Sequence, residues 1–502
     1  MKALIALPLL GALAFLPVPA VTAVPPCNSL AEFLDCVTAP AVYDHMSAFQ
    51  TIADANGDNR ASGTSGYDQS ADYVAGLMSA AGYDVTVQAF MYSAFFVLSP
   101  TALEEISPVA MVFPNNILSF SGSGDVTAAV THLPAAPADP SPGCDAADFA
   151  GFTPGHIALI ERGGCTFAVK AVNASAAGAT GVIFYNDEAG DINATLGADF
   201  TPDLPVTGVT QSIGQQLAAE VGLIMRLKTE TDRGPFTTAN VLAETPGGDP
   251  EKVIMVGAHL DSVRGSPGIQ DNGSGSAAIL EVALQLAKVQ VTNKVRFAWW
   301  GAEEVGLQGS KYYLDNLSPE ALSKIALYLD FHMIASPNYV FFILDGDDSD
   351  GVGFPAGPPG SAAIEALFES FYTGRGLPFT GEDLTARSDY FFFGSAGIPI
   401  GGIFAGAEVV KSAPEAALWG GVAGEQYDPC FHLACDTLAN HSMVALDTNS
   451  DAAAYAIYKL AEVIREVPTV TALPIAGLAL LASLLVLAGG FAAHRRVVPQ
   501  KH

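Results

Sequence analysis

The sequence predicts an α/β fold, in which a mixed, largely parallel sheet is flanked by helices and a β-rich domain is inserted. From residue 239 onward, strand-like runs such as KVIMVGAHL and KVRFAWWGA alternate with helical runs such as SGSAAILEVALQLAKV, as a parallel sheet requires. From residue 119 to about residue 235 the pattern changes to short apolar runs separated by proline and glycine. We therefore expect one main domain from residues 40–118 and 236–466, with residues 119–235 as the insert.

The stretch before the insert supports this division. Within GYDQSADYVAGLMSAAGYDVTVQAF, apolar residues at helical spacing give way after Gly82 to an apolar-polar alternation. The pattern predicts a helix, a glycine stop and then a strand. These are the first elements of the main domain.

Composition excludes two classes of protein. The chain has 502 residues, 50% of them hydrophobic, and a formal charge of -30. A disordered chain has few hydrophobic residues, and a nucleic-acid-binding protein needs a basic face. We therefore expect a globular protein with no nucleic-acid partner.

Both ends of the chain indicate export. Residues 1–23 have the order of a secretory signal peptide, with an apolar stretch before small residues. Residues 474–493 carry no charge and are long enough to span a membrane, and His494, Arg495 and Arg496 follow at once. This segment is either a transmembrane anchor or a sorting tail that is removed. We expect an extracellular, periplasmic or cell-surface protein, with contact to the membrane through this helix.

The cysteines fit an exported protein. There are six of them, an even number that favours pairing in an oxidising compartment. Their order along the chain predicts three disulfides: Cys27 with Cys36, Cys144 with Cys165, and Cys430 with Cys435.

Candidate site residues follow the predicted strands. Active sites of open α/β sheets gather at the carboxyl ends of the strands. A histidine or an acid pair in such a place is more often structural, and DNGSG alone is a turn with a helix cap. Zn²⁺ prefers imidazole and carboxylate ligands, however, and five loops supply them here. The residues are His259, Asp261, Asp271, Glu303, Glu304, His332 and His432.

Several separate motifs carry a family resemblance. The segments GAHLDSV, PGIQDNGSGSAAILE, WWGAEEVGLQGS, MIASPN, ARSDYFFF and DPCFHLACDT resemble the M28 family of zinc peptidases. The segment ERGGCTFAVKAVNASAAGATGVIFYND in the insert is similar to the protease-associated (PA) domain of aminopeptidase Y-like members. The resemblance covers most of residues 40–466. It implies a zinc exopeptidase fold and peptide substrates.

The resemblance also implies a role for each site residue. Asp271 would bridge two zinc ions, of which His259 would bind one, while Glu304 and His432 would bind the other. Glu303 would be the general base. Asp261 would accept a hydrogen bond from His259 and fix its tautomer. If the backbone is extended at the acid pair, the two side chains point in opposite directions, so that one faces the metal and the other the water.

Two positions depart from the family pattern. His332 stands where the family has an aspartate that binds the first zinc and helps hold the substrate's ammonium group. We expect looser zinc at that position and weaker recognition of a free N-terminus, unless His332 only packs beside the site. Phe431 replaces a tyrosine whose hydroxyl steadies the reaction intermediate, which implies a slower enzyme.

The resemblance places further residues around the substrate. The backbone carbonyl of Arg387 would contact the ammonium group, and Met333 and Phe404 would line an apolar pocket. The acidic loop 345–360 could bind Ca²⁺, but its spacing is not that of an EF-hand, and a solvated loop is favoured. Oligomeric state is open.

The sequence therefore predicts a dinuclear zinc aminopeptidase that releases apolar N-terminal residues. Two alternatives stay open: a catalytically impaired receptor-like binding protein, and a carboxypeptidase or dipeptidase of the same fold.

Overall fold

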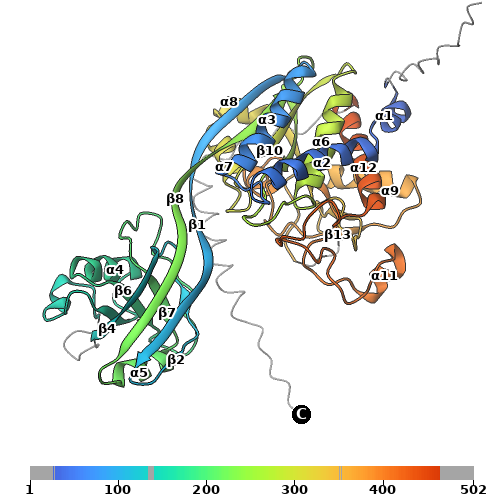
Figure 1. The fold of residues 1–502 in the computed structure, drawn as a ribbon. Helices are drawn as coiled ribbons and strands as arrows, with labels where there is room; N and C mark the ends of the chain where they lie inside the picture. Colours follow the sequence, from blue (N-terminus) through green and yellow to red (C-terminus); the bar gives the residue numbers. More distant parts are fainter. Residues whose placement is uncertain (1–26, 28, 134–140, 350, 352, 464–502) are drawn as a thin grey trace, which may run out of the picture.

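The computed structural model describes residues 27, 29–133, 141–349, 351 and 353–463. The predicted signal peptide (1–23) and C-terminal helix (474–493) lie outside these residues. Within the described part of the chain, no helix has the length and apolar character needed to span a membrane. Figure 1 shows a larger body and a smaller insert joined by two long strands, β1 (Asp84–Ser107) and β8 (Ile224–Glu244).

The sheet of the larger body is mixed and largely parallel, which confirms the predicted fold class. Its strands lie in the order β13-β12-β14-β11-β9-β10-β8, and β1 pairs with β8. Neighbours from β14 to β10 are parallel, whereas β8 and β12 join antiparallel. The strands not yet given are β9 (Asp249–His259), β10 (Asn293–Trp300), β11 (Ile325–His332), β12 (Phe342–Leu344), β13 (Thr380–Glu382) and β14 (Ile400–Phe404).

Helices cover both faces of this sheet, so its central strands are buried on both sides. Successive strand residues alternate between two apolar clusters: Phe297 and Trp299 belong to one, Ala298 and Trp300 to the other. Burial on both faces explains why β10 reads as a nearly continuous apolar run. The first face carries α1 (Leu30–Cys36), α2 (Ala39–Ala55), α3 (Ser65–Ala80), α6 (Gly273–Leu286), α9 (Ser361–Gly374) and α12 (Met443–Val463). The second carries α7 (Gln308–Asp315), α8 (Pro319–Ser323) and α10 (Tyr390–Ser395). Helix α11 (Ala413–Trp419) has no buried residue, and only its last residue, Trp419, packs against the apolar clusters.

The insert has its own apolar clusters, and its strands extend the sheet beyond β8. Four of its strands run parallel in the order β4-β5-β6-β7, and a short β3 joins antiparallel. The elements are β2 (Met111–Val112), β3 (Asn116–Ile117), β4 (Gly124–Leu133), β5 (Ile157–Glu161), β6 (Gly181–Tyr185) and β7 (Val206–Val209), with η1 (Ala146–Phe149), α4 (Phe167–Ala176) and α5 (Gln211–Ala219).

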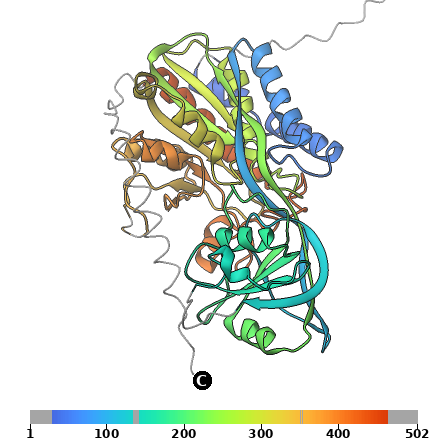
Figure 2. The same cartoon turned by 90° about the vertical axis from the view of Figure 1, so that its left-hand side faces the viewer.

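The two bodies share strands. Residues 241–244 of β8 pair with β10 in the larger body, whereas residues 224–229 of the same strand pair with β4 in the insert. Strand β1 runs beside β8 over this whole length, as the turned view of Figure 2 also shows. The predicted boundary between residues 235 and 236 falls in the middle of β8, so the two bodies are connected by a two-stranded ribbon.

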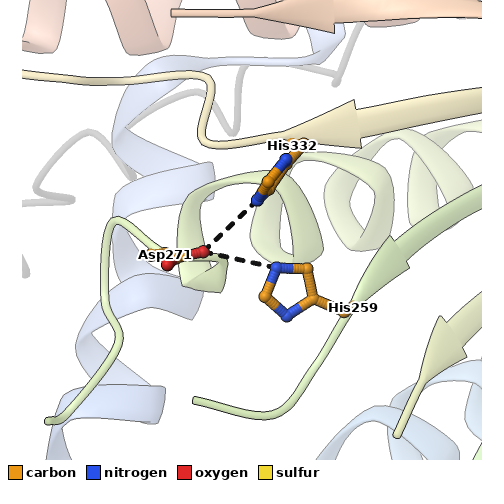
Figure 3. Close-up of side chains that lie close together, drawn as sticks. All are labelled: His259, Asp271 and His332. Carbon is orange, nitrogen blue, oxygen red and sulfur yellow. Dashed lines mark ion pairs between the residues drawn. The ribbon is translucent and has the colours of Figure 1, made fainter. Parts of the chain in front are cut away.

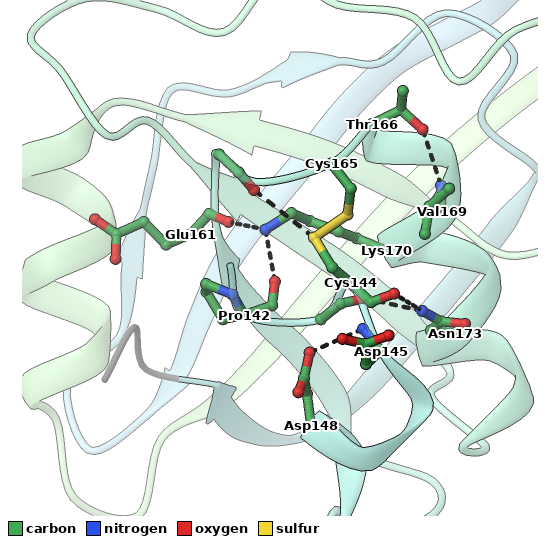
Figure 4. Close-up of a disulfide and its surroundings, with 12 residues drawn as sticks. Pro142, Cys144, Asp145, Asp148, Glu161, Cys165, Thr166, Val169, Lys170 and Asn173 are labelled. Atoms are coloured by element: carbon green, nitrogen blue, oxygen red, sulfur yellow. Dashed lines mark hydrogen bonds between the residues drawn. A yellow bond between two sulfur atoms is a disulfide. The ribbon is translucent and has the colours of Figure 1, made fainter. Parts of the chain in front are cut away.

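All three predicted disulfides are present: Cys27–Cys36, Cys144–Cys165 and Cys430–Cys435. In the insert, Cys144–Cys165 joins the loop before η1 to the loop before α4 (Figure 4). The buried Lys170 donates to the carbonyls of Pro142 and Glu161 on either side of this bridge. The disulfide and the lysine therefore hold the same pair of loops together.

A buried arginine organises the loop that follows β9. Arg60 has no exposed surface, and its guanidinium donates to the backbone carbonyls of Leu260, Pro267 and Gly268. Its guanidinium carbon lies 5.0 Å from the centre of the Phe49 ring. Residues 260–271, which carry two candidate site residues, are thus held by one side chain from the loop after α2.

We predict that Arg60→Lys lowers the free energy of unfolding by about 2–5 kcal/mol, because an ammonium group cannot reach all three carbonyls and buried acceptors lose their donors. Chemical denaturation followed by tryptophan fluorescence measures this change. Arg375→Lys is the matched control, since Arg375 is 38% exposed and forms a single ion pair with Asp451, and ion pairs near the surface contribute at most about 1 kcal/mol. Equal effects of the two substitutions would contradict the assigned role of Arg60.

Candidate metal centre

The candidate site lies at the carboxyl ends of three neighbouring strands. His259 is the last residue of β9, and His332 is the last of β11. Asp271 stands two residues before α6, while Glu303 and Glu304 follow β10. His432 comes from the loop closed by Cys430–Cys435. The structure therefore brings together the side chains that the sequence places far apart.

Two groups of potential ligand atoms share Asp271. In the first, Asp271 Oδ1 lies 3.3 Å from His259 Nε2 and 3.4 Å from His332 Nε2 (Figure 3). In the second, His432 Nε2 lies 3.2 Å from Asp271 Oδ2 and 3.0 Å from Glu304 Oε2. Within each group all ligand atoms lie within 4.8 Å of one another. The two oxygens of one carboxylate thus face two adjacent positions for a cation.

The DNGSG turn fixes Asp271 beside β11. Asn272 accepts from the N–H of Gly275 and donates to the carbonyl of Phe331, so it caps α6 and ties the helix to the strand. A Cβ at Gly275 would lie 2.2 Å from the Phe331 carbonyl oxygen, which explains the glycine. The carboxylate of Asp436 accepts from the N–H groups of Gln270 and Asp271. The sequence analysis missed Asp436, whose only signal is its place in DPCFHLACDT.

Asp261 accepts from His259, as expected, and the acceptor is its backbone carbonyl. His259 Nδ1 lies 3.0 Å from the backbone carbonyl of Asp261 and 3.7 Å from its carboxylate. A carbonyl can only accept, so the proton is on Nδ1 and the lone pair of Nε2 faces Asp271. The carboxylate of Asp261 instead accepts from the backbone N–H of Glu303. Asp261 therefore helps to position both His259 and Glu303.

The acid pair lies in a turn. Strand β10 ends at Trp300, and residues 304–306 form a turn in which the carbonyl of Glu303 accepts from the N–H of Gly306. Both Glu303 and Glu304 line the same cavity. The acids therefore do not continue an extended strand, because the chain bends at residues 301–302 and turns at residues 304–306.

Burial and mutual repulsion shift the pKa values of these groups. Burial raises the pKa of Glu303 well above its ordinary value, with His259 opposing the shift and Asp389 adding to it. Burial and the neighbouring Asp271 raise the pKa of Glu304 to about 7. Burial also acts to raise the pKa of Asp271, but the imidazoles around it outweigh this effect and hold that pKa well below the usual range. Positive charge at the centre would therefore stabilise the ionised forms of Glu303 and Glu304.

A cavity of about 430 Å³ opens over this centre. Phe404 lines it and stacks on His332, with 5.6 Å between the ring centres, and Phe431 lines it and stacks on His432 at 3.8 Å. Arg387 lies at its edge, where its guanidinium donates to Glu408. Met333, expected in the lining, is fully buried and absent from it. The sequence analysis missed Asp330, Glu382 and Tyr390, which do line the cavity.

The residues present fit a divalent cation. Three buried atoms of this centre have no hydrogen-bond partner among the described residues: His259 Nε2, Asp271 Oδ1 and Glu304 Oε1. Buried polar atoms without partners are rare in folded proteins and ask for an explanation. These lone pairs belong to the nitrogen and oxygen donors that borderline-soft cations take.

A third acidic cluster lies in the loop considered for Ca²⁺. Carboxyl oxygens of Asp345, Asp347 and Glu365 lie within 4.8 Å of one another. The backbone N–H groups of Gly346 and Asp347 donate to Glu365, and that of Asp347 also donates to Asp345. The amides of the loop thus satisfy its acids.

Comparison with known proteins agrees with the motifs. The model of peptidase family M28 matches residues 240–457, and that of the PA domain matches residues 126–217. An aminopeptidase of Pseudomonas aeruginosa is 46% identical over 432 residues, which cover 84% of this chain and 80% of that protein. A probable lipoprotein aminopeptidase of Mycobacterium tuberculosis is 42% identical over 432 residues and 84% of each chain. Leucine aminopeptidase 2 of Arthroderma otae is 40% identical over 417 residues, 82% of this chain and 81% of its own.

Solved structures show the same fold. An aminopeptidase from Aneurinibacillus sp. strain AM-1 superposes with a TM-score of 0.59 at 25% identity, over 86% of this chain and 96% of that one. A zinc aminopeptidase from Bacillus subtilis superposes with a TM-score of 0.55 at 25% identity, over 86% and 98%. The resemblance drawn from the motifs is confirmed, and so is the expectation of a peptide-hydrolysing enzyme. The chain belongs to peptidase family M28 and carries an inserted PA domain.

Proposed function

We propose that the chain is an exported aminopeptidase that works with two zinc ions and releases apolar N-terminal residues from peptides. One observation carries the proposal: two groups of imidazole and carboxylate donors meet at the single carboxylate of Asp271. The relatives named aminopeptidase and leucine aminopeptidase support the reaction, and the zinc aminopeptidase of Bacillus subtilis supports the metal.

The two donor groups assign the ligands. His259 and His332 would hold the first zinc, Glu304 and His432 would hold the second, and Asp271 would contact both. Zinc bound there would polarise the peptide carbonyl and make water more acidic. Among the ligands assigned to the first position, only the shared carboxylate is negatively charged, whereas the second position also has Glu304.

Glu303 is the base in this proposal. It is buried, lines the cavity beside both donor groups, and its backbone N–H is held by Asp261. From this place Glu303 takes a proton from the attacking water and returns it to the nitrogen of the leaving amine. Glu304 lies 3.0 Å from His432 in the second donor group, so Glu304 is assigned to metal binding and Glu303 to proton transfer.

The cavity selects the N-terminal residue. Phe404, Ile403 and Leu344 give it an apolar wall, which favours apolar side chains. The free ammonium group would lie near Glu303 and the backbone carbonyl of Arg387. His332 supplies no negative charge there, so the ammonium group is held less firmly than by a carboxylate.

Export is proposed on two grounds. The three disulfides are typical of an oxidising compartment, and a similar protein of Mycobacterium tuberculosis is named a probable lipoprotein.

The first test addresses both the proposed aminopeptidase reaction and the role of Glu303 as its base. The zinc-loaded protein should hydrolyse leucine anilide but not its N-acetylated form, and Glu303→Gln should lower turnover by about 10²–10⁴ because the water loses its proton acceptor. Metal analysis should find the zinc content of Glu303→Gln unchanged. Glu304→Gln is the control, and it should lose close to one zinc. Full turnover in Glu303→Gln would exclude it as the base.

The second test concerns the charge at His332. Metal titration by calorimetry should resolve two zinc affinities, with the weaker site at His259 and His332, since this site has one carboxylate fewer. His332→Asp should tighten that site and lower the KM for leucine anilide. Two equally tight sites in the unmodified protein would contradict the assignment.

The third test concerns Phe431, which lies in the cavity but has no hydrogen-bond donor. Phe431→Tyr should raise kcat by about tenfold or more, because a hydroxyl donor can stabilise the developing negative charge. Phe431→Leu, which also lacks a hydroxyl, serves as the control for changes in packing against His432. An unchanged kcat in Phe431→Tyr would mean that no donor is missing at this position.

A further inference from the structure

A second cavity, of about 360 Å³, lies next to the metal centre. Glu304 lines both cavities, and Asp261 also lines the second. Its remaining wall comes from strand β1 of the ribbon, the loop after β9, the loop after α2 and Val305. We call this cavity the ribbon groove and define it by Phe95, Phe96, Val97, Leu98, Val263 and Arg264.

The ribbon groove has an apolar wall that is open to solvent. Val97 and Leu98 are 47% and 52% exposed, although both are large apolar residues. The register of β1 against β8 shifts between Val97 and Ser99, so the wall lies where the ribbon is irregular. Exposed apolar residues that line a groove offer a surface for an apolar side chain of a ligand.

Arg264 is the only basic residue among the described residues that line this groove. One of its Nη groups donates to Asp232 at 2.6 Å, and its guanidinium carbon lies 3.7 Å from the centre of the Phe96 ring. These contacts hold the guanidinium in place at the groove. A guanidinium carries five N–H donors, and the contact with Asp232 uses one nitrogen, which leaves capacity for a second carboxylate.

The position of the groove identifies its occupant. In the proposed reaction the N-terminal residue fills the first cavity, and the scissile bond lies beside Glu303 and Glu304. The chain beyond that bond must leave the centre, and the ribbon groove is a neighbouring cavity, since Glu304 lines both. An apolar wall suits the side chain of the first leaving residue. The cation suits a carboxylate close behind it.

We propose that the ribbon groove binds the leaving part of the substrate, and that Arg264 gives the enzyme a preference for dipeptides and tripeptides with a free C-terminal carboxylate. This inference rests on the proposed function. Arg264 is here a specificity-determining residue and takes no part in the chemistry.

The test compares three substrates of the zinc-loaded protein: Leu-Phe, Leu-Phe-amide and Leu-amide. Leu-amide has no residue that reaches the groove. Arg264→Gln should lower kcat/KM for Leu-Phe by about tenfold, and should change it little for Leu-Phe-amide and Leu-amide, because only the free acid loses a charge-assisted contact. Asp232→Asn is the control for the ion pair, and it should preserve the preference for the free acid.

A second pair of variants tests the apolar wall. Leu98→Asp should lower kcat/KM for Leu-Phe and Leu-Phe-amide but leave Leu-amide unchanged. Val87→Asp is the matched control, since Val87 is 54% exposed on the same strand and does not line the groove. Calorimetric binding of Leu-Phe to Glu303→Gln protein, with and without Arg264→Gln, gives a readout that needs no turnover.

The outcomes separate the two proposals. If the unmodified protein hydrolyses Leu-amide but Arg264→Gln leaves the ratio of Leu-Phe to Leu-Phe-amide unchanged, the groove proposal is wrong and the proposed function stands. Parallel losses on all three substrates would also overturn it, since they indicate a structural role. If zinc-loaded protein leaves Leu-amide intact, both proposals fail.

Discussion

The arrangement of the site depends on the placement of one buried carboxylate. Asp271 is 3% exposed and lies within 3.4 Å of imidazole nitrogens from three separate segments. Asn272 fastens the turn to β11, and Asp436 accepts the backbone N–H of Asp271. Further back, Arg60 holds the carbonyls of the loop that leads to it. The centre is thus set by neutral and charged hydrogen bonds to main-chain atoms.

The parts of the site that could be predicted from the sequence are those that local patterns reveal. Strand ends can be located from apolar runs, and parallel strands bring their ends together, so His259, Glu304 and His332 could be grouped in advance. The family motifs added Asp271 and His432 to this group. The disulfides followed from the order of the cysteines. The PA insert and the mixed sheet followed from local composition and motifs.

What could not be predicted depends on contacts between distant segments. The bend and turn after Trp300 take Glu303 and Glu304 out of the extended strand, and the apolar run before them does not indicate this. A residue type does not reveal that Asp261 holds His259 through its carbonyl. Arg60 stands about 200 residues before the carbonyls it binds and belongs to no recognisable pattern. Met333 matches the family motif, yet its side chain is fully buried and does not line the cavity. Its backbone N–H donates to the side chain of Asn272.

The shared strands have a mechanical consequence. A domain on a flexible linker can rotate without disturbing its neighbour, but β1 and β8 are hydrogen-bonded from the outer end of the insert to β10. Any swing of the insert must therefore bend a continuous antiparallel ribbon. Arg264 is attached to that ribbon by Asp232 and Phe96, while its backbone belongs to the loop that begins with Asp261. Bending of the insert would therefore be transmitted through Arg264 to the loop that carries Asp261, beside the metal centre.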